Sequence, residues 1–182
     1  IGVGLVGSEM CIRDRGHPAV IRYNEIDDMF IPTDNLIIAV HSNEGTLFNG
    51  DSLKVIEELT KKSWTIPYSV RVDSLTNYSY VKSVNDDLIV EPFIEEAEKK
   101  SIEFFEKREN LVAGEDIIYK SLISEDKKTS VVSIIVDPPG PNKEDQNTEL
   151  INYILGFIEP IKESNENLDI RLLGNPYLCL LY

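Results

Sequence analysis

The architecture depends on one short run, Val70-Arg71-Val72-Asp73-Ser74-Leu75-Thr76-Asn77-Tyr78, in the first half of the chain. Residues 70–75 are rich in β-branched and apolar side chains and predict a strand. The Ser and Asn side chains that follow can hydrogen-bond the backbone of a turn. The run therefore predicts the end of a strand–helix–strand unit, and the neighbouring elements can be placed outward from it.

The two elements before this run complete that unit. Residues 35–42 contain the nearly continuous apolar sequence Leu-Ile-Ile-Ala-Val, which predicts a central strand covered on both faces. A helix is expected from Asn49, a suitable N-cap, to the residue before Pro67, which ends it. At helical spacing, one face of this helix would carry Leu53, Ile56, Thr60 and Trp64.

The segment after the run is longer than a minimal domain requires. Residues 80–90 alternate loosely around a turn-like Asn85-Asp86-Asp87, and a charged helix is expected over residues 93–112, ended by Gly114. This helix has a polar face with i,i+4 pairs and one apolar stripe. We therefore expect an insertion at about residues 79–114 that packs one face on the main domain.

The second half repeats the pattern. Residues 117–124 and 129–137 predict a hairpin, and the Pro-Pro-Gly-Pro sequence after it is a clear break. A helix with a broad apolar face follows, which Pro160 should kink or end. Residues 168–173 are the last expected strand. Without the insertion the order is βαβ-βαβ, which predicts an α+β, ferredoxin-like split βαβ fold: an antiparallel sheet with its helices on one face.

Composition restricts the partners. The 182-residue chain has 32 acidic and 18 basic residues, a formal net charge of -14. Nucleic acid and anionic lipid headgroups are not expected partners, because both require a positive surface. No run approaches the roughly 20 apolar residues that would span a bilayer.

Both ends of the sequence are atypical. Residues 1–15 have no helical or strand period, and residues 7–15 resemble translated sequencing-adapter read-through; residues 179–182 resemble the start of a similar tail. We expect both to be non-native, with one domain over residues 16–178. Cys11 and Cys179 fall in these ends, so no disulfide, thiol nucleophile or zinc site is predicted.

The inventory of reactive side chains does not favour an enzyme. His17 and His41 are the two histidines, and the sequence lacks a Gly-x-Ser-x-Gly elbow and a phosphate-binding loop. Acidic doublets are frequent, but none has the alternating spacing of a calcium loop. We therefore predict no catalytic residue, no metal site and no cofactor.

Five pieces of the chain, in order, resemble the first extracytoplasmic domain of exporters in the resistance-nodulation-division superfamily, in the MMPL-like branch. They are residues 30–40, residues 47–60, the run Val72-Asp73-Ser74-Leu75-Thr76-Asn77-Tyr78, residues 122–136, and Gly174-Asn175-Pro176. The resemblance implies a porter-type domain of a proton-driven exporter, on the periplasmic side of a bacterial inner or cell membrane. The proton-coupling acids of that family lie in membrane helices, which this segment does not contain.

The resemblance also implies partners. They are the other domains of the same transporter chain, a lipidic or amphiphilic substrate, and a second copy in a homo-oligomer. Contact with substrate or a neighbouring domain would fall on Ser74, Leu75, Thr76, Asn77 and Tyr78. The competing interpretation of this corner is a strand end whose turn is satisfied by Ser and Asn side chains. The alternative for the whole chain is a free-standing ferredoxin-like module that binds a small ligand or a protein.

Overall fold

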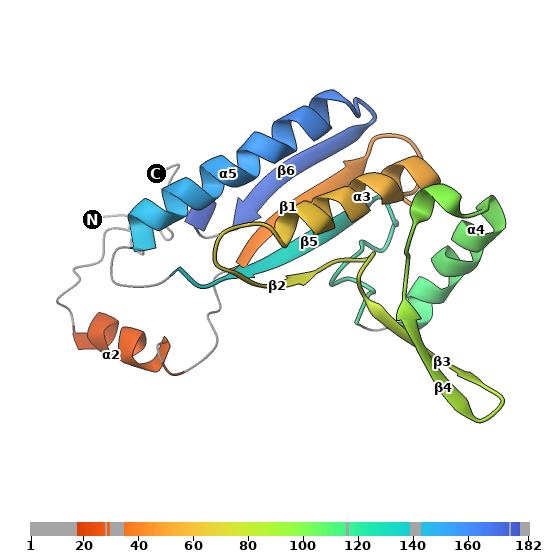
Figure 1. Ribbon diagram of the computed structural model, residues 1–182, viewed down its shortest axis with the longest axis horizontal. Coiled ribbons are helices and arrows are strands. Elements are labelled where there is room, and N and C mark those ends of the chain that lie inside the picture. The colour runs from red at the N-terminus through yellow and green to blue at the C-terminus, as the bar shows by residue number, and fades with distance from the viewer. Residues whose placement is uncertain are drawn as a thin grey trace, which may run out of the picture.

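The computed structural model describes residues 18–27, 29, 35–115, 117–138, 143–174 and 176–178. Within these residues the chain is α+β, with one four-stranded and one two-stranded antiparallel sheet (Figure 1). A helix, α2 (Pro18–Asp27), precedes the first strand. No described helix is both long enough and apolar enough to cross a membrane.

The larger sheet contains β1 (Asn35–Ser42), β2 (Ser69–Asp73), β5 (Thr129–Val136) and β6 (Leu168–Gly174). Its strand order is β2-β5-β1-β6, and every neighbouring pair is antiparallel. The strands at residues 35–42, 70–75 and 168–173 are confirmed in position. Since β5 lies between β1 and β2, the first strand–helix–strand unit has a strand from the second half of the chain inserted into it.

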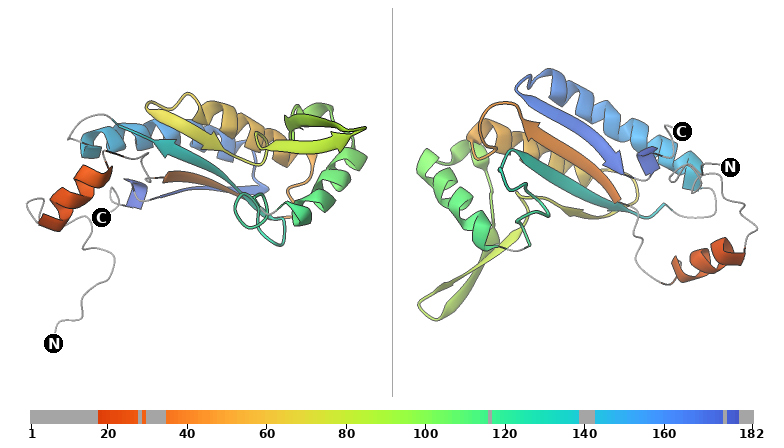
Figure 2. Two further views of the ribbon diagram at one scale, coloured as in Figure 1. Left: turned by 90° about the horizontal axis from the view of Figure 1, so that it is seen from below. Right: turned by 180° about the vertical axis from the view of Figure 1, so that it is seen from behind.

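The two long helices cover one face of this sheet. Helices α3 (Gly50–Ser63) and α5 (Lys143–Glu163) lie on the same side of the strands (Figure 2). Alternate residues of β1 point toward them and are fully buried, namely Leu36, Ile38 and Val40. The residues between them are half-buried on the opposite face. The apolar run of β1 is thus explained by a core on one face and partial cover on the other.

The predicted start of α3 is confirmed. The side chain of Asn49 accepts a hydrogen bond of 2.8 Å from the backbone N–H of Ser52, as an N-cap does. The expected apolar face is confirmed for Leu53 and Ile56, which are fully buried. It is wrong for Trp64, which is 52% exposed because the helix ends at Ser63 and the backbone turns there.

The segment expected as an insertion contains a hairpin and one short helix. Strands β3 (Ser79–Val84) and β4 (Asp87–Pro92) pair around the expected turn, in which Asn85 and Asp86 both have positive φ. They are followed by η1 (Ala97–Lys99), α4 (Ile102–Leu111) and η2 (Val112–Gly114).

The single helix predicted over residues 93–112 is therefore wrong in its first half. Glu96 adopts a left-handed backbone conformation, with φ 51°, which interrupts a helix there. Ser101 then caps a new helix by accepting from the N–H of Phe104. Phe93 and Ile94, which should have begun the long helix, are instead buried in the core next to the end of β4.

The strand expected at residues 117–124 is absent; the described residues there form turns and two isolated bridges, including Ile123 to Ser130. Strand β2 covers its edge of β5 only over residues 133–136, so Ile123 can bridge Ser130, but residues 118–122 form successive turns, most of whose N–H groups donate to the carbonyls of Glu115 and Ile118. The expected end of the helix at Pro160 is also wrong, because α5 continues through it to Glu163. A proline at this place removes only one hydrogen bond, and the helix ends one turn later.

Candidate functional site

The chain forms a corner directly after β2, held by three buried hydroxyl groups. The Thr60 hydroxyl donates to the carbonyl oxygen of Ile56 at 2.7 Å and lies 2.9 Å from Ser74 Oγ. Thr76 Oγ1 lies 3.0 Å from Ser74 Oγ and 3.2 Å from Thr60 Oγ1. The corner is therefore fastened to α3 by a small polar network inside the core.

Asn77 closes this corner as a turn. Its Oδ1 accepts from the Ser74 backbone N–H at 2.8 Å, and its Nδ2 donates to the carbonyl of Val72 at 2.7 Å. Both ends of the amide are used on the backbone of the preceding residues, which closes the turn at the end of β2. These contacts agree with the interpretation that the Ser and Asn side chains satisfy a strand-end turn.

The corner offers little accessible surface. Ser74 and Leu75 are fully buried and Thr76 is 4% exposed, so contact with another molecule at this corner would fall on Asn77 and Tyr78. The Tyr78 hydroxyl donates to Glu115 at 3.3 Å, and burial, followed by the nearby Glu115 carboxylate, raises the pKa of this phenol. A contact with substrate or a neighbouring domain stays a prediction for these two residues.

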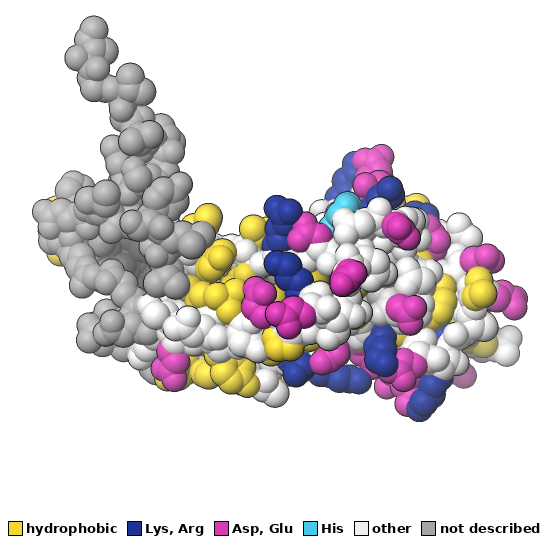
Figure 3. All heavy atoms as spheres, turned by 90° about the horizontal axis from the view of Figure 1, so that it is seen from above, with side chains coloured by type: hydrophobic (Ala, Val, Ile, Leu, Met, Phe, Trp, Pro, Cys, Tyr) yellow, Lys and Arg dark blue, Asp and Glu magenta, His cyan; other side chains and the backbone are white. Residues whose placement is uncertain are grey.

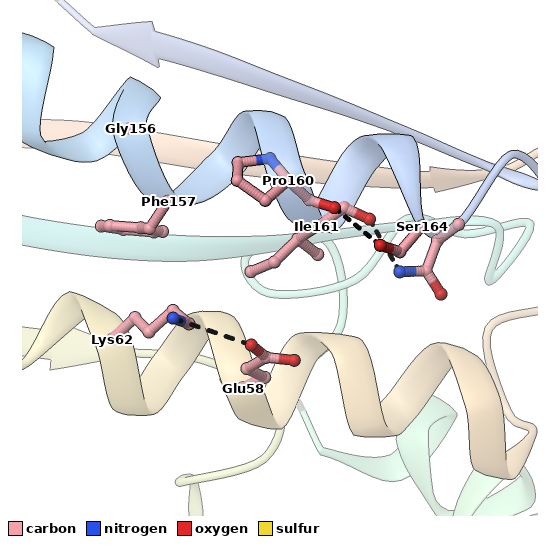
Figure 4. Close-up of a pocket in the computed structure, with 8 residues that line it drawn as sticks. Glu58, Lys62, Gly156, Phe157, Pro160, Ile161 and Ser164 are labelled. Atoms are coloured by element: carbon pink, nitrogen blue, oxygen red, sulfur yellow. Dashed lines mark hydrogen bonds and ion pairs between the residues drawn. The ribbon is translucent and has the colours of Figure 1, made fainter.

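A shallow groove between α3 and α5 is the other candidate site. One part of it, about 300 Å³, is lined by both helices, and Figure 4 shows Lys62 pointing toward Glu58 on the α3 side while Phe157 comes from α5. The adjoining part, about 400 Å³, shares Lys62, Gly156 and Phe157 with it. Lys62 Nζ and Glu58 Oε1 are 3.8 Å apart, which leaves the ammonium loosely held.

Two features of α5 open this groove. A Cβ at Gly156 would meet no atom within 4 Å, so the helix surface is hollow at that point. Four residues later Pro160 has no N–H to donate to the Gly156 carbonyl, which leaves that acceptor without its helical partner. Along the rim the Thr65 and Tyr153 hydroxyls lie 3.1 Å apart. The groove therefore presents hydroxyl, ammonium and aromatic groups, but the residues that line it do not form an arrangement of nucleophile and base.

The surface carries several exposed apolar side chains. Leu88 is 74% exposed, Val90 63% and Val81 52%, all on the β3–β4 hairpin, and Val70 on β2 is 52% exposed. On the face drawn in Figure 3, acidic and basic side chains are interleaved, with hydrophobic side chains between them. Exposed apolar groups that cluster on one element are typical of an interaction surface.

Metal ligands do not gather in the described part of the chain, where no group of three His, Cys, Asp or Glu side chains could hold an ion. His41, the described histidine, has its Nδ1 2.9 Å from Thr129 Oγ1. Cys11 and Cys179 lie outside the described residues.

The groove between α3 and α5 was not predicted from the sequence. Its one local sign was a glycine, Gly156, within a predicted helix and followed four residues later by Pro160.

No protein-family model matches this chain, and no curated protein is significantly similar to it. A functional proposal for the chain therefore rests on the geometry of the described residues and on the resemblance carried by the five short pieces.

Proposed function

We propose that the larger sheet and its two helices form a ferredoxin-like split βαβ domain. Numbering only the strands of the larger sheet, the observed order β2-β5-β1-β6 becomes 2-3-1-4, with a helix after the first strand and another after the third. This interleaving of two βαβ units supports the assignment. The hairpin, α4 and the short helices then form an insertion between the second and third strands.

We further propose that this domain is the extracytoplasmic, porter-type part of a proton-driven exporter of the resistance-nodulation-division superfamily. The observation that carries the proposal is the exposed apolar surface of the hairpin, where Leu88, Val90 and Val81 are each more than half exposed. Such a surface is typical of a site where another protein or domain docks, as the sister domains of an exporter would. The ordered resemblance of the five pieces supports the same choice.

In this proposal the domain lies on the periplasmic side of a bacterial inner or cell membrane. It packs against other domains of the same chain and contributes to a path for lipidic or amphiphilic substrates. Its role is binding and conformational, and we propose no catalytic residue. Of the corner residues, Asn77 and Tyr78 are the ones that would face a substrate or a neighbouring domain.

Cell fractionation tests this proposal. An antibody raised against the purified chain should detect, in the source cells, a band in the washed membrane fraction that is much larger than 20.6 kDa. The signal should resist extraction by alkaline carbonate and appear after detergent solubilisation. A band of the size of this chain alone in the high-speed supernatant would contradict the proposal.

One observation favours the alternative of a free-standing small-ligand module, namely the α3–α5 groove with its freed Gly156 carbonyl and loosely paired Lys62. In that case a ligand seated in the groove would change the emission of Trp64, which adjoins the groove residue Thr65. The same fractionation distinguishes the two functions, because the module would be found in the supernatant.

A further inference from the structure

The hairpin of β3 and β4, residues 79–92, forms an arm on the molecule. This arm projects from the body of the chain (Figure 1), and its two strands pair only with each other among the described residues. Each strand therefore has one edge without a described partner strand. A two-stranded ribbon is marginally stable in water, and an unpaired edge is a template for another strand.

The base of the arm is firmly held. Arg108 Nη2 of α4 lies 2.6 Å from Glu91 Oε1, and the same carboxylate is 2.8 Å from Lys82 Nζ. The Arg108 guanidinium also lies 4.9 Å from the centre of the Tyr80 ring and 5.1 Å from that of Phe93. These contacts fix the orientation of the arm relative to α4, so the positions of its two outer strand edges are fixed as well.

The turn determines which backbone groups point outward. Asn85 and Asp86, with φ of 49° and 70°, form a two-residue hairpin turn. The closing pair Val84–Asp87 is then hydrogen-bonded, and such pairs alternate along the ribbon. The outward N–H and C=O groups of β3 consequently belong to Ser79, Val81 and Ser83. No described residue outside the arm makes a backbone hydrogen bond to these three.

The edge of β4 is protected against pairing with itself. Its outward groups belong to Leu88, Val90 and Pro92, and Pro92 has no N–H to donate. A two-fold pairing about Val90 would place Leu88 opposite this proline and Ile89 opposite Glu91. The symmetric β4 contact about Val90 therefore lacks one hydrogen bond at each end and buries a carboxylate beside an apolar side chain.

The edge of β3 contains no proline and is complementary to itself. An antiparallel pairing about Val81 places Val81 opposite its own copy, Ser79 opposite Ser83, and Tyr80 opposite Lys82. Every outward N–H and C=O of the three odd-numbered residues then has a partner, and no like charges face each other. We propose that a second copy of this chain binds along β3 in this register and joins the two arms into one four-stranded sheet.

The strength of the proposed dimer depends on the net charge of the two chains and on the size of the contact between them. Each copy carries a net charge of -14, and strands of this length span only about 20 Å. The contact is thus of the small, weak class, and salt strengthens it by screening the repulsion between the two acidic chains. This inference stands apart from the proposed function, since it uses only the geometry of the arm.

A matched pair of proline variants tests the register. Sedimentation equilibrium of the whole chain, up to about 1 mM, should show a monomer–dimer equilibrium that tightens with added salt. Val81→Pro removes an outward N–H and should weaken the dimer about tenfold or more. Val90→Pro removes the outward N–H directly across the ribbon, on the protected edge, and should leave the dimer unchanged. Circular dichroism of both variants confirms that they fold.

A disulfide gives a second readout that does not depend on proline. In the proposed register the two copies of residue 81 are a hydrogen-bonded pair, with Cα atoms about 5.5 Å apart, which suits a disulfide. With Cys11 and Cys179 replaced by Ser, Val81→Cys should form a covalent dimer on mild oxidation and Val90→Cys should not. A chain that is monomeric at every concentration and salt level, or equal effects at positions 81 and 90, would overturn the proposal.

Discussion

The Arg108 guanidinium and the Glu91 carboxylate form an ion pair of 2.6 Å (Nη2 to Oε1) that joins α4 to the base of the arm. The Arg108 side chain is only 9% exposed, although it carries a charge. Three aromatic rings surround it within about 5 Å, those of Tyr80, Phe93 and Phe104. The arm is thus held by one buried cation in an aromatic cage, rather than by an apolar core of its own.

Loss of this cation should destabilise the chain. Arg108→Met fills the space but leaves Glu91 with Lys82 alone, and we expect about 2 kcal/mol less stability, a value reduced because Glu91 is itself partly exposed. Urea unfolding followed by circular dichroism measures the change. Arg71→Met is the control, since its pair with Asp73 is exposed and its loss should hardly move the midpoint. Equal effects of both variants would count against the cage.

The same carboxylate gives a pH dependence. The hydrogen bond from Lys82, and then that from Arg108, lowers the pKa of Glu91 below its ordinary 4.5. Because the folded pKa is below the unfolded one, the stabilisation is complete above about pH 4.5 and is lost as pH falls through the folded value. The difference in unfolding free energy between wild type and Glu91→Gln should therefore be largest near pH 7 and shrink as the pH falls below about 4.5. A difference that is constant with pH would contradict this.

The Asn77 turn predicts the effects of two substitutions. Asn77→Ala removes both hydrogen bonds of the amide and leaves the N–H of Ser74 unpaired in the core, which should cost about 2 kcal/mol. Asn77→Asp keeps an acceptor for Ser74 but sets a carboxylate oxygen against the Val72 carbonyl oxygen, so its cost relative to wild type should be large at neutral pH and fall when the carboxyl is protonated. Denaturant unfolding at neutral and at acidic pH measures both variants; a cost for Asn77→Asp that does not change with pH would contradict the contact with Val72.

Two glycines should respond to alanine with opposite signs. At Gly174 φ is +126°, and a Cβ would collide with the Asn35 carbonyl oxygen across the β1–β6 pair, so Gly174→Ala should cost about 3 kcal/mol. At Gly156 a Cβ meets nothing, and Gly156→Ala should add up to about 1 kcal/mol through helix propensity. Thermal unfolding compares the two, and a stable Gly174→Ala variant would contradict the described β6 end.

The elements with strong local signals could be predicted from the sequence. The apolar run of β1, the Asn49 cap of α3 and the turn at Asn85 and Asp86 were all identified correctly, because each depends on neighbouring residues. The side chains of Ser74 and Asn77 could be assigned to a strand-end turn for the same reason, whereas the link of Ser74 and Thr76 to Thr60 could not.

The failures have a different origin. The run at residues 117–124 has a strand-like composition, but most of its N–H groups close turns onto Glu115 and Ile118, and only Ile123 bridges β5, a choice that composition does not show. The break before α4 depends on Glu96 in a left-handed conformation that its residue type does not favour. The Arg108 cage and the groove beside Gly156 join residues from distant parts of the chain, so local patterns could not reveal them.

The central claim, that this domain belongs to an exporter, is tested most directly by long-read sequencing across the source locus. The account predicts apolar stretches of about 20 residues adjoining the domain on both sides, with a second similar extracytoplasmic domain downstream. It also predicts that the native reading frame replaces residues 1–15 and 179–182 with other sequence. A start codon shortly before the domain and a stop codon shortly after it, with no apolar stretch between them, would contradict the account.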